Sequence, residues 1–292
     1  MKKSHSKTHL LFYILITILL ALIVWTIWGN TALMANSITL SGNQIPSEFS
    51  GFRIAQISDL HNAEFGEGNS HLLNSLSESK PDMIAITGDL VDAQHTNIDV
   101  ALSFAEKAVQ IAPVYYVTGN HEASLSQYSE LKTGLEAAGV IVLEDKAIQL
   151  EHNGGIVTLM GLSDPNFTIK SNIFDEVPAM ISTKLNDLME DKAGYTILLS
   201  HRPELFDTYV SCGVDLVLSG HAHGGQFRLP LIGGLVAPNQ GFFPKYDAGL
   251  YTNGGTNMVV SRGLGNSIIP LRFNNRPEIV LVELKAERQA KG

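Results

Sequence analysis

The sequence predicts an α/β domain preceded by one N-terminal transmembrane helix. Three observations support this prediction. An uncharged apolar run lies near the N-terminus, short apolar runs rich in β-branched residues alternate with amphipathic segments after it, and polar residues of metal-ligand type directly follow several of these runs. Because strands that alternate with helices place their loops at one edge of a sheet, we expect these polar clusters to lie close together.

Residues 10–28 form the predicted transmembrane helix. The run carries no charge and would be about 28 Å long as a helix, which is enough to cross a bilayer core. Lys2, Lys3 and Lys7 precede it, and the next basic residue along the chain is Arg53. The positive-inside rule therefore predicts a cytoplasmic N-terminus and an extracytoplasmic remainder, so that the protein is a single-pass protein of the cell membrane.

A cleaved signal peptide is the alternative to this anchor. The best cleavage candidate after the apolar run has Leu33 where a small residue is needed, so we favour an uncleaved anchor. No linker or repeat divides the remaining residues, which indicates one domain. The predicted organisation is a cytoplasmic tail (1–9), an anchor (10–28), a spacer with a short strand at 37–40 (29–50), one α/β domain (51–285) and a frayed tail (286–292).

Hydrophobic periodicity predicts the elements of this domain in order. The sequence His152-Asn153-Gly154-Gly155 predicts a hairpin between two of the strands. The predicted strands cover 52–57, 83–86, 114–117, 148–151, 156–161, 195–199, 214–218, 258–261 and 278–284. The predicted helices begin near residue 69 and cover 98–109, 127–138 and 179–189.

The charge of the chain argues against nucleic acid as a partner. The net charge is −9, or −12 for the exported part once the three N-terminal lysines are subtracted. An acidic surface repels polyanions at long range, so non-specific binding of DNA or RNA is disfavoured.

Two histidines in Ser219-Gly220-His221-Ala222-His223-Gly224-Gly225 follow the predicted strand at 214–218. On extended backbone at a strand's end, two imidazoles one residue apart point to the same side. Neutral imidazole is a good ligand for manganese, zinc or iron, and the donor set does not choose among these metals. Glycines on both sides allow a sharp turn.

Other ligand-type residues follow four further predicted strands. Carboxylates, an amide and several imidazoles are too many ligands for one tetrahedral ion, and they suit two ions roughly 3.5–4 Å apart. Asp89 stands in a turn after Gly88 and is the natural bridge, because a carboxylate has lone pairs for both ions. The full set is Asp59, His61, Asp89, Asn120, His121, His201, His221 and His223.

These clusters resemble the calcineurin-like metallophosphoesterase family, and in particular its membrane-associated bacterial subgroup. The family blocks occur in order over residues 52–284 as Asp59-x-His61, Gly88-Asp89, Gly119-Asn120-His121-Glu122, Ser200-His201 and Gly220-His221-x-His223. The subgroup resemblance is carried by Gly224-Gly225-Gln226, Gly249-Leu250-Tyr251 and Ser261-Arg262-Gly263-Leu264-Gly265.

The resemblance implies a four-layer α/β/β/α sandwich with two divalent metal ions over its central sheets. One ion would be held by Asp59, His61, Asp89 and His223, and the other by Asp89, Asn120, His201 and His221. His121 would not be a ligand. It would be a catalytic residue that steadies the phosphoryl oxygen or protonates the leaving group. Asp92 and Glu122 are candidates for orienting the histidines, with ordinary turn carboxylates as the alternative.

The predicted reaction is hydrolysis of a phosphate ester by a metal-bound hydroxide, since metal binding lowers the pKa of water from about 15.7 towards 7. Arg202, Arg262 and Arg272 are candidate phosphate clamps, although salt bridges at the surface explain them equally well. The apolar stretch from Phe227 to Phe243 is either packing or a rim that admits a lipid-linked phosphate.

Two alternatives to this enzyme remain. One is a nuclease of the same superfamily, which the acidic charge disfavours. The other is a non-catalytic, membrane-tethered protein that binds metal for structure. The Asn120-His121 pair argues against the second, because a structural metal site needs no open coordination position. The sequence does not define the oligomeric state or the physiological substrate.

Overall fold

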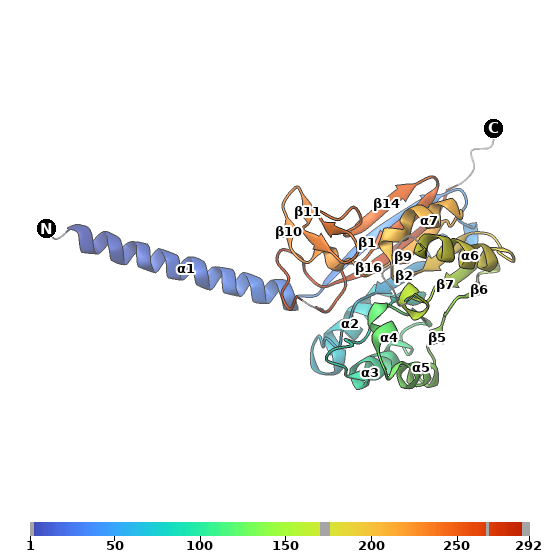
Figure 1. The fold of residues 1–292 in the computed structure, drawn as a ribbon, viewed down its shortest axis with the longest axis horizontal. Coiled ribbons are helices and arrows are strands. Elements are labelled where there is room, and N and C mark those ends of the chain that lie inside the picture. Colours follow the sequence, from blue (N-terminus) through green and yellow to red (C-terminus); the bar gives the residue numbers. More distant parts are fainter. Residues whose placement is uncertain (1–2, 170–175, 267–268, 288–292) are drawn as a thin grey trace.

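A computed structural model describes residues 3–169, 176–266 and 269–287 of the chain, with side chains from residue 9 onward. The helix α1 (Lys3–Thr31) begins within the predicted tail and projects away from the domain (Figure 1). Its segment His9–Thr31 is the one helix in this described part that is long and apolar enough to cross a membrane. Most of the predicted frayed tail lies outside the described residues.

Two six-stranded sheets form the centre of the domain. In the first, the order is β1-β16-β2-β3-β4-β5, and only the pairing of β16 with β2 is antiparallel. Its strands are β1 (Met34–Gly42), β16 (Glu278–Ala286), β2 (Arg53–Ile57), β3 (Met83–Thr87), β4 (Val114–Val117) and β5 (Ile141–Val142).

The second sheet has the order β14-β15-β9-β8-β7-β6. Its four central strands are parallel, and β14 and β6 pair antiparallel at the two edges. The predicted hairpin is confirmed as the turn between β6 and β7. The strands are β14 (Gly249–Asn253), β15 (Thr256–Val260), β9 (Leu216–Ser219), β8 (Thr196–Leu199), β7 (Gly155–Gly161) and β6 (Lys146–His152).

The predicted four-layer sandwich is confirmed by where alternate residues of each strand lie. On β2, Ile54 packs between the two sheets, whereas Ala55 and Ile57 pack under the helices outside the first sheet. On β8, Ile197 faces the space between the sheets and Leu198 faces the helices outside the second sheet. Strand side chains alternate between faces, so each sheet buries both of its faces.

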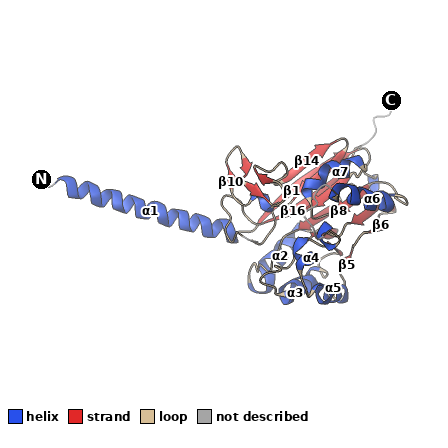
Figure 2. Cartoon of the chain, in the orientation of Figure 1, coloured by secondary structure: helices blue, strands red, loops and turns tan. Residues whose placement is uncertain are grey.

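Helices cover the two outer faces (Figures 1 and 2). The first sheet is covered by α2 (Ser70–Ser79), α3 (Ile98–Ala108) and α5 (Tyr128–Ala137). The second is covered by α6 (Val177–Met189) and α7 (Phe206–Ser211). A short helix, α4 (Asn120–Ser124), follows β4. The longer helices confirm the predicted periodicity, whereas α4 and α7 are too short to show one.

The predicted spacer contains a full strand of the first sheet. Strand β1 pairs in parallel with β16 along its whole length, from Met34 opposite Glu278 to Gly42 opposite Ala286. The strand is therefore longer than the predicted 37–40, and the sheet begins before residue 51. Single-sequence alternation is weak here because β1 is an edge strand with only Leu40 fully buried.

Four two-residue strands form two small hairpins after β9, a region without a predicted strand. They are β10 (Arg228–Leu229) with β11 (Gly233–Gly234), and β12 (Val236–Ala237) with β13 (Gly241–Phe242). Strands this short carry no readable alternation, so only the folded chain reveals them.

Candidate metal centre

The predicted ligand residues meet where strands of both sheets end. Asp59 and His61 follow β2, Asp89 follows β3, and Asn120 starts the helix after β4. From the second sheet, His201 follows β8, and the histidine pair follows β9. Six of the seven predicted ligands are buried, and Asn120 is half-buried. Asp59 and His223 are 164 positions apart in the chain, yet they belong to the same site. The positions of these residues at strand ends predicted that they would lie close together.

The backbone around these residues is held in unusual conformations. Five of the seven predicted ligands have positive φ: Asp59, His61, Asp89, His221 and His223. Positive φ is uncommon for residues other than glycine and costs free energy, so its concentration here points to a functional site. Glycine is needed beside them, because a Cβ on Gly220 would lie 1.8 Å from Ser58 Oγ.

The prediction of extended backbone at His221 and His223 is wrong. His221 has a φ of 65° and His223 a φ of 47°, and the chain turns into a single turn of 3-10 helix at His223–Gly225. Because the loop turns between the two residues, the imidazoles reach different neighbours. His221 lies against His201, and His223 lies against His61.

The first group of ligand-type side chains is Asp59, His61 and His223. His223 Nε2 lies 3.4 Å from Asp59 Oδ1 and 3.3 Å from His61 Nε2. Three buried donor atoms at such spacing face a common point. Two of them are nitrogens with lone pairs and the third is a carboxylate oxygen, which is a donor set that suits a divalent transition metal.

The second group is Asp89, His201 and His221. His201 Nε2 lies 3.2 Å from Asp89 Oδ2 and 3.2 Å from His221 Nδ1. The same Asp89 oxygen is 3.6 Å from His61 Nε2 in the first group. Asp89 therefore lies between the two groups, as a bridging carboxylate must. Asn120 Oδ1 is buried without a hydrogen-bond partner, so its lone pairs are available to a cation.

Hydrogen bonds orient several of these imidazoles. His201 Nδ1 lies 2.7 Å from the carbonyl oxygen of Thr87, so Nδ1 donates to that oxygen and Nε2 is the nitrogen that faces Asp89. His221 Nε2 lies 3.0 Å from Arg202 Nη1 and 3.3 Å from Asn239 Oδ1, so Nδ1 is the nitrogen that faces His201 and the site. Asn239 lies between β12 and β13, and no motif in the sequence pointed to it.

The two predicted supporting carboxylates act differently. Asp92 Oδ2 is 4.0 Å from His61 Nδ1, while its other oxygen accepts from the N–H groups of Gln94 and His95. Glu122 does not orient a histidine. It accepts hydrogen bonds from the backbone N–H groups of Gly119, Asp89, Leu90 and Val91, and so it fixes the loop that carries Asp89.

Burial and charge set the protonation of the site. Burial lowers the pKa of His61 to about 4 and that of His223 to about 3, and burial together with Arg202 lowers the pKa of His221. These imidazoles are therefore neutral at pH 7, as metal ligands must be. Burial also opposes the charged form of His201, but the Asp89 carboxylate outweighs it and raises the pKa of His201 to about 10.

Glu122 is a buried carboxyl group with a perturbed pKa near the site. Burial and the negative charge of Asp89 raise the pKa of Glu122 to about 8, against the effect of the backbone N–H groups that it accepts. A cation beside Asp89 would cancel part of that negative charge, so metal binding favours the carboxylate form of Glu122.

His121 lies at the edge of both groups. Its ring is 4.5 Å from that of His61, centroid to centroid, and its backbone N–H donates to Asp89 Oδ1 at 2.9 Å. Its Nδ1 accepts from the N–H of Ala93 at 3.0 Å. The proton of the neutral ring is therefore on Nε2, which makes this nitrogen a hydrogen-bond donor.

The three arginines differ in their surroundings. Arg202 is buried and binds Asp164 through two hydrogen bonds of 2.5 and 2.9 Å, so its guanidinium is already paired rather than at the surface. Arg272 is also buried and donates to the carbonyl oxygens of Arg262 and Gly265. Arg262 is partly exposed, with Nε 3.6 Å from Glu278. Asp164 was not among the predicted site residues, because it lies in a loop that matches none of the family blocks.

These side chains fit two divalent ions. The fit is shown by two groups of buried donors, by a carboxylate between them and by an amide oxygen that has no other partner. A third group of nearby donors, His61, Asp92 and His121, lies beside the first and shares His61 with it. The donor atoms do not distinguish manganese, zinc and iron.

Comparison with known proteins identifies a family whose members have such a metal site. Residues 52–225 match the sequence model of the family described as calcineurin-like phosphoesterase. The chain is 30% identical over 253 residues to the uncharacterized metallophosphoesterase YkuE of Bacillus subtilis, covering 85% of this chain and 84% of that one. It is 29% identical over 243 residues to the phosphodiesterase YaeI of Escherichia coli, covering 80% and 82%.

Among solved structures, TT1561 of Thermus thermophilus has a similar fold. The TM-score is 0.51 at 15% identity, and the match covers 74% of this chain and 91% of that one. The fold and the site together define a metal-dependent phosphoester hydrolase. The chain belongs to the calcineurin-like phosphoesterase family.

Proposed function

We propose that this chain is a membrane-anchored phosphoesterase with two metal ions, and that it hydrolyses phosphodiesters or lipid-linked phosphates outside the cytoplasm. The observation that carries the proposal is the position of Asp89. One of its oxygens lies 3.2 Å from His201 and 3.6 Å from His61, so a single carboxylate serves both groups of buried ligands.

One ion would be held by Asp59, His61, Asp89 and His223, and the other by Asp89, Asn120, His201 and His221. When bound, such ions supply a nucleophile by lowering the pKa of water towards about 7, and they stabilise charge on phosphoryl oxygens. The protein residues hold the ligands in place through the strained loops and through Glu122.

His121 is the proposed catalytic residue besides Asp89. Because the Ala93 N–H fixes the ring with its proton on Nε2, His121 would donate a hydrogen bond to a phosphoryl or leaving-group oxygen. As a hydrogen-bond donor, His121 keeps its proton throughout the reaction. Protonation of the leaving group, the other predicted role, would require it to give that proton up.

The rim of the site favours a substrate with an apolar part. The hairpin β12–β13 carries Asn239, whose Oδ1 is 3.3 Å from His221, and it also carries Phe242. Phe242 is 75% exposed and Phe243 is 61% exposed. Large aromatic side chains exposed on the hairpin that also carries Asn239 suit the acyl or prenyl chains of a lipid-linked phosphate.

The anchor supports the same substrate class. Helix α1 is long enough to span a bilayer, and the lysines that precede the apolar segment support a cytoplasmic N-terminus. Membrane attachment keeps the domain where lipid substrates are concentrated. The acidic charge of the exported part supports exclusion of nucleic acid.

The test is hydrolysis by the purified full chain in detergent. With Mn²⁺ the protein should hydrolyse a chromogenic phosphodiester, lose this activity in EDTA and regain it when Mn²⁺ is returned. A panel of phosphomonoesters, phosphodiesters, lipid pyrophosphates and DNA then identifies the substrate class. Metal binding without hydrolysis of any of them would contradict the proposed enzyme, and preference for DNA would favour the nuclease.

A further inference from the structure

The surface of the domain next to α1 carries exposed apolar side chains. It is formed by the β10–β11 hairpin and the segment 269–273, which are joined by hydrogen bonds from Gln226 Nε2 to the carbonyl oxygens of Ile269 and Leu271. Leu231 is fully exposed at the tip of the hairpin, and Ile232 is 63% exposed. This surface, called the apolar face below, comprises Leu229, Leu231, Ile232, Ile269, Leu271 and Phe273.

The apolar face is attached to the end of α1. The side chain of Asn30 donates to the carbonyl oxygen of Arg272 at 2.9 Å and accepts from its backbone N–H at 2.8 Å. Arg276 donates to the carbonyl oxygens of Ala32 and Leu33, and its guanidinium lies 4.5 Å from the ring of Trp28. These contacts fix the helix relative to the apolar face.

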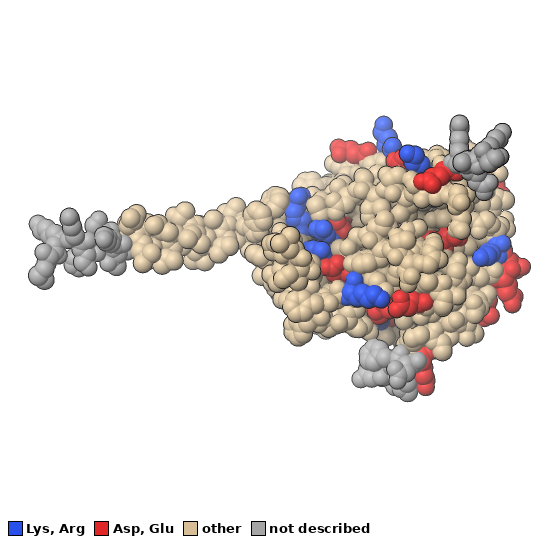
Figure 3. All heavy atoms as spheres, turned by 90° about the horizontal axis from the view of Figure 1, so that it is seen from above, with Lys and Arg blue, Asp and Glu red and all other residues tan. Residues whose placement is uncertain are grey.

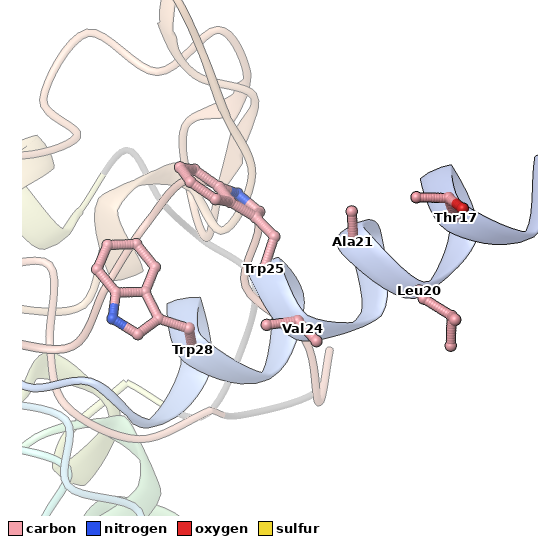
Figure 4. Close-up of a pocket in the computed structure, with 6 residues that line it drawn as sticks. All are labelled: Thr17, Leu20, Ala21, Val24, Trp25 and Trp28. Atoms are coloured by element: carbon pink, nitrogen blue, oxygen red, sulfur yellow. The ribbon is translucent and has the colours of Figure 1, made fainter. Parts of the chain in front are cut away.

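The hairpin also extends alongside the helix. A cavity of about 330 Å³ between them is lined by Leu22, Trp25, Pro230, Phe273 and Asn274. Trp25 and Trp28 extend from the helix toward the domain, and Thr17 and Leu20 lie further from it (Figure 4). Leu22 and Trp25 lie six and three residues before Trp28, about 9 and 5 Å along the helix axis. Pro230 lines the same cavity, so it lies inward from the end of the predicted span by up to about 9 Å.

We propose that the apolar face is a second membrane contact, which enters the outer leaflet beside α1. This inference rests on the membrane anchoring in the proposed function. A bilayer that surrounds Leu22 and Trp25 would also reach Pro230, which lines a cavity with them, and the next residue, Leu231, is fully exposed. A depth of about 9 Å is within the 5–10 Å over which interfacial elements bury their apolar side chains.

The charges around the apolar face fit the same position. Lys and Arg side chains lie at the end of the domain from which the helix projects (Figure 3). Arg276, over Trp28, is at the level where basic and aromatic side chains meet lipid headgroups. Anionic headgroups attract such cations, whereas the acidic remainder of the domain is repelled from the bilayer.

This contact also relates the metal centre to the membrane. Arg272, whose backbone binds Asn30, has its guanidinium nitrogen Nη2 3.4 Å from Nδ1 of His223. Helix, apolar face and ligand loop therefore share one buried residue. Insertion of the apolar face would therefore hold the metal centre at a fixed height relative to the bilayer.

The depth of the apolar face can be measured with a fluorophore. In the Cys212→Ser background, which has no other cysteine, single cysteines replace Leu231, Val24 or Ile141 and are labelled with an environment-sensitive dye. The full chain is placed in vesicles of phosphatidylethanolamine and phosphatidylglycerol with or without bromine on the acyl chains. Val24 lies within α1, and Ile141 is an exposed apolar residue on β5, away from the helix.

Brominated lipid should quench the dye at positions 231 and 24 but leave the dye at 141 as bright as in ordinary lipid. The dye at 231 should also emit at a shorter wavelength than the dye at 141, because its surroundings are less polar. Quenching at 24 without quenching at 231 would overturn the second contact and leave the anchor intact. Absence of quenching at both positions would overturn the anchor and this inference together, whereas hydrolysis of a soluble diester tests the enzyme separately.

Discussion

Asp89 is the residue on which both ligand groups depend. Its side-chain oxygens face His61, His201 and the backbone N–H of His121, while its own backbone N–H is held by Glu122. Its φ is positive, and Gly88 before it has no room for a Cβ, which would lie 2.7 Å from His201 Nδ1. The carboxylate is placed by the surrounding structure rather than by the preference of its own backbone.

Replacing His121 tests the role of its ring. His121→Ala should lower the turnover of a chromogenic diester by roughly 10²–10³-fold, because the hydrogen-bond donor to the reacting phosphate is lost. Its metal content, measured by elemental analysis, should stay the same. His71→Ala, an exposed histidine on α2, is the matched control and should keep full turnover. Loss of metal from His121→Ala would make His121 a ligand instead.

The buried histidines predict how the metal-free protein responds to acid. The pKa of His61 is about 4 and that of His223 about 3 in the folded protein, against an ordinary value of 6.5. Below pH 6.5 the unfolded chain binds protons at these residues that the folded protein does not bind, so stability falls as the pH drops toward 4. His201, with its raised pKa of about 10, changes little over this range, because its contribution is full below pH 6.5 and is lost between pH 6.5 and about 10. Glu122, with its raised pKa of about 8, acts in the opposite direction, because it adds stability as the pH falls from about 8 to 4.5, and it offsets part of the loss from the two histidines.

The measurement is the Tm of the EDTA-treated full chain in detergent, followed by circular dichroism from pH 7 to pH 4. The Tm should fall with pH, and it should fall less steeply in His223→Gln, which lacks one of the two groups. A Tm that rises over this range would show that these imidazoles are charged in the folded state.

At the scale of elements, the loops of the site are built on strand ends from both sheets. Strands β2, β3 and β4 are neighbours in the first sheet, and β8 and β9 are neighbours in the second. Glycines allow the two sets of loops to touch: a Cβ on Gly220, after β9, would collide with Ser58 and Asp59, after β2. Correct pairing of the sheets is therefore a condition for assembling either ligand group.

Removing strand β1 tests whether the metal centre depends on the complete first sheet. A chain beginning at Leu33 should be soluble and folded, whereas a chain beginning at Gly51 should aggregate. The shorter chain lacks the nine-residue pairing with β16 and the buried side chains of Leu40, Ile45 and Phe49. Circular dichroism and size-exclusion chromatography measure the difference. A folded, metal-binding chain from Gly51 would show that the segment is a spacer after all.

In the whole molecule, the anchor, the apolar face and the metal centre lie on one connected path. The helix ends at Thr31, the chain enters β1 at Met34, and the segment around Arg272 contacts both the helix end and the ligand loop. The exposed aromatic residues of the rim lie on the hairpin that directly follows the apolar β10–β11 hairpin. This arrangement is the basis for proposing substrates that reside in the membrane.

Polar substitutions at the rim test the substrate class. Phe242→Ser with Phe243→Ser should lower turnover of a vesicle-embedded lipid phosphate more than turnover of a soluble diester, because only the lipid has a chain to contact the rim. The ratio of the two rates is the measured quantity. Ile156→Ser, an exposed apolar residue on β7, is the control and should leave the ratio unchanged. An unchanged ratio in the phenylalanine variant would argue against a lipid substrate.

Much of the fold was predictable because the central strands are buried on both faces and read as short apolar runs. The same runs placed Asp59, Asp89 and His201 at strand ends, and the structure brings these residues together. The edge strand β1 and the hairpins formed by β10–β13 were harder to predict from the sequence, because few of their side chains are buried. Asn239 was missed because its position near His221 depends on how a hairpin folds over the site.

The sequence by itself determined the order of strands and helices, the anchor-like helix and the residue types available as ligands, because these depend on periodicity and covalent order. The family resemblance already implied which ligands share an ion. Only the tertiary structure decided that the loop turns at positive φ at both His221 and His223 and that Arg202 is already paired with Asp164. Such contacts join residues far apart in the chain, and they follow from how the two sheets pack and how the loops turn at positive φ, neither of which a single sequence encodes locally.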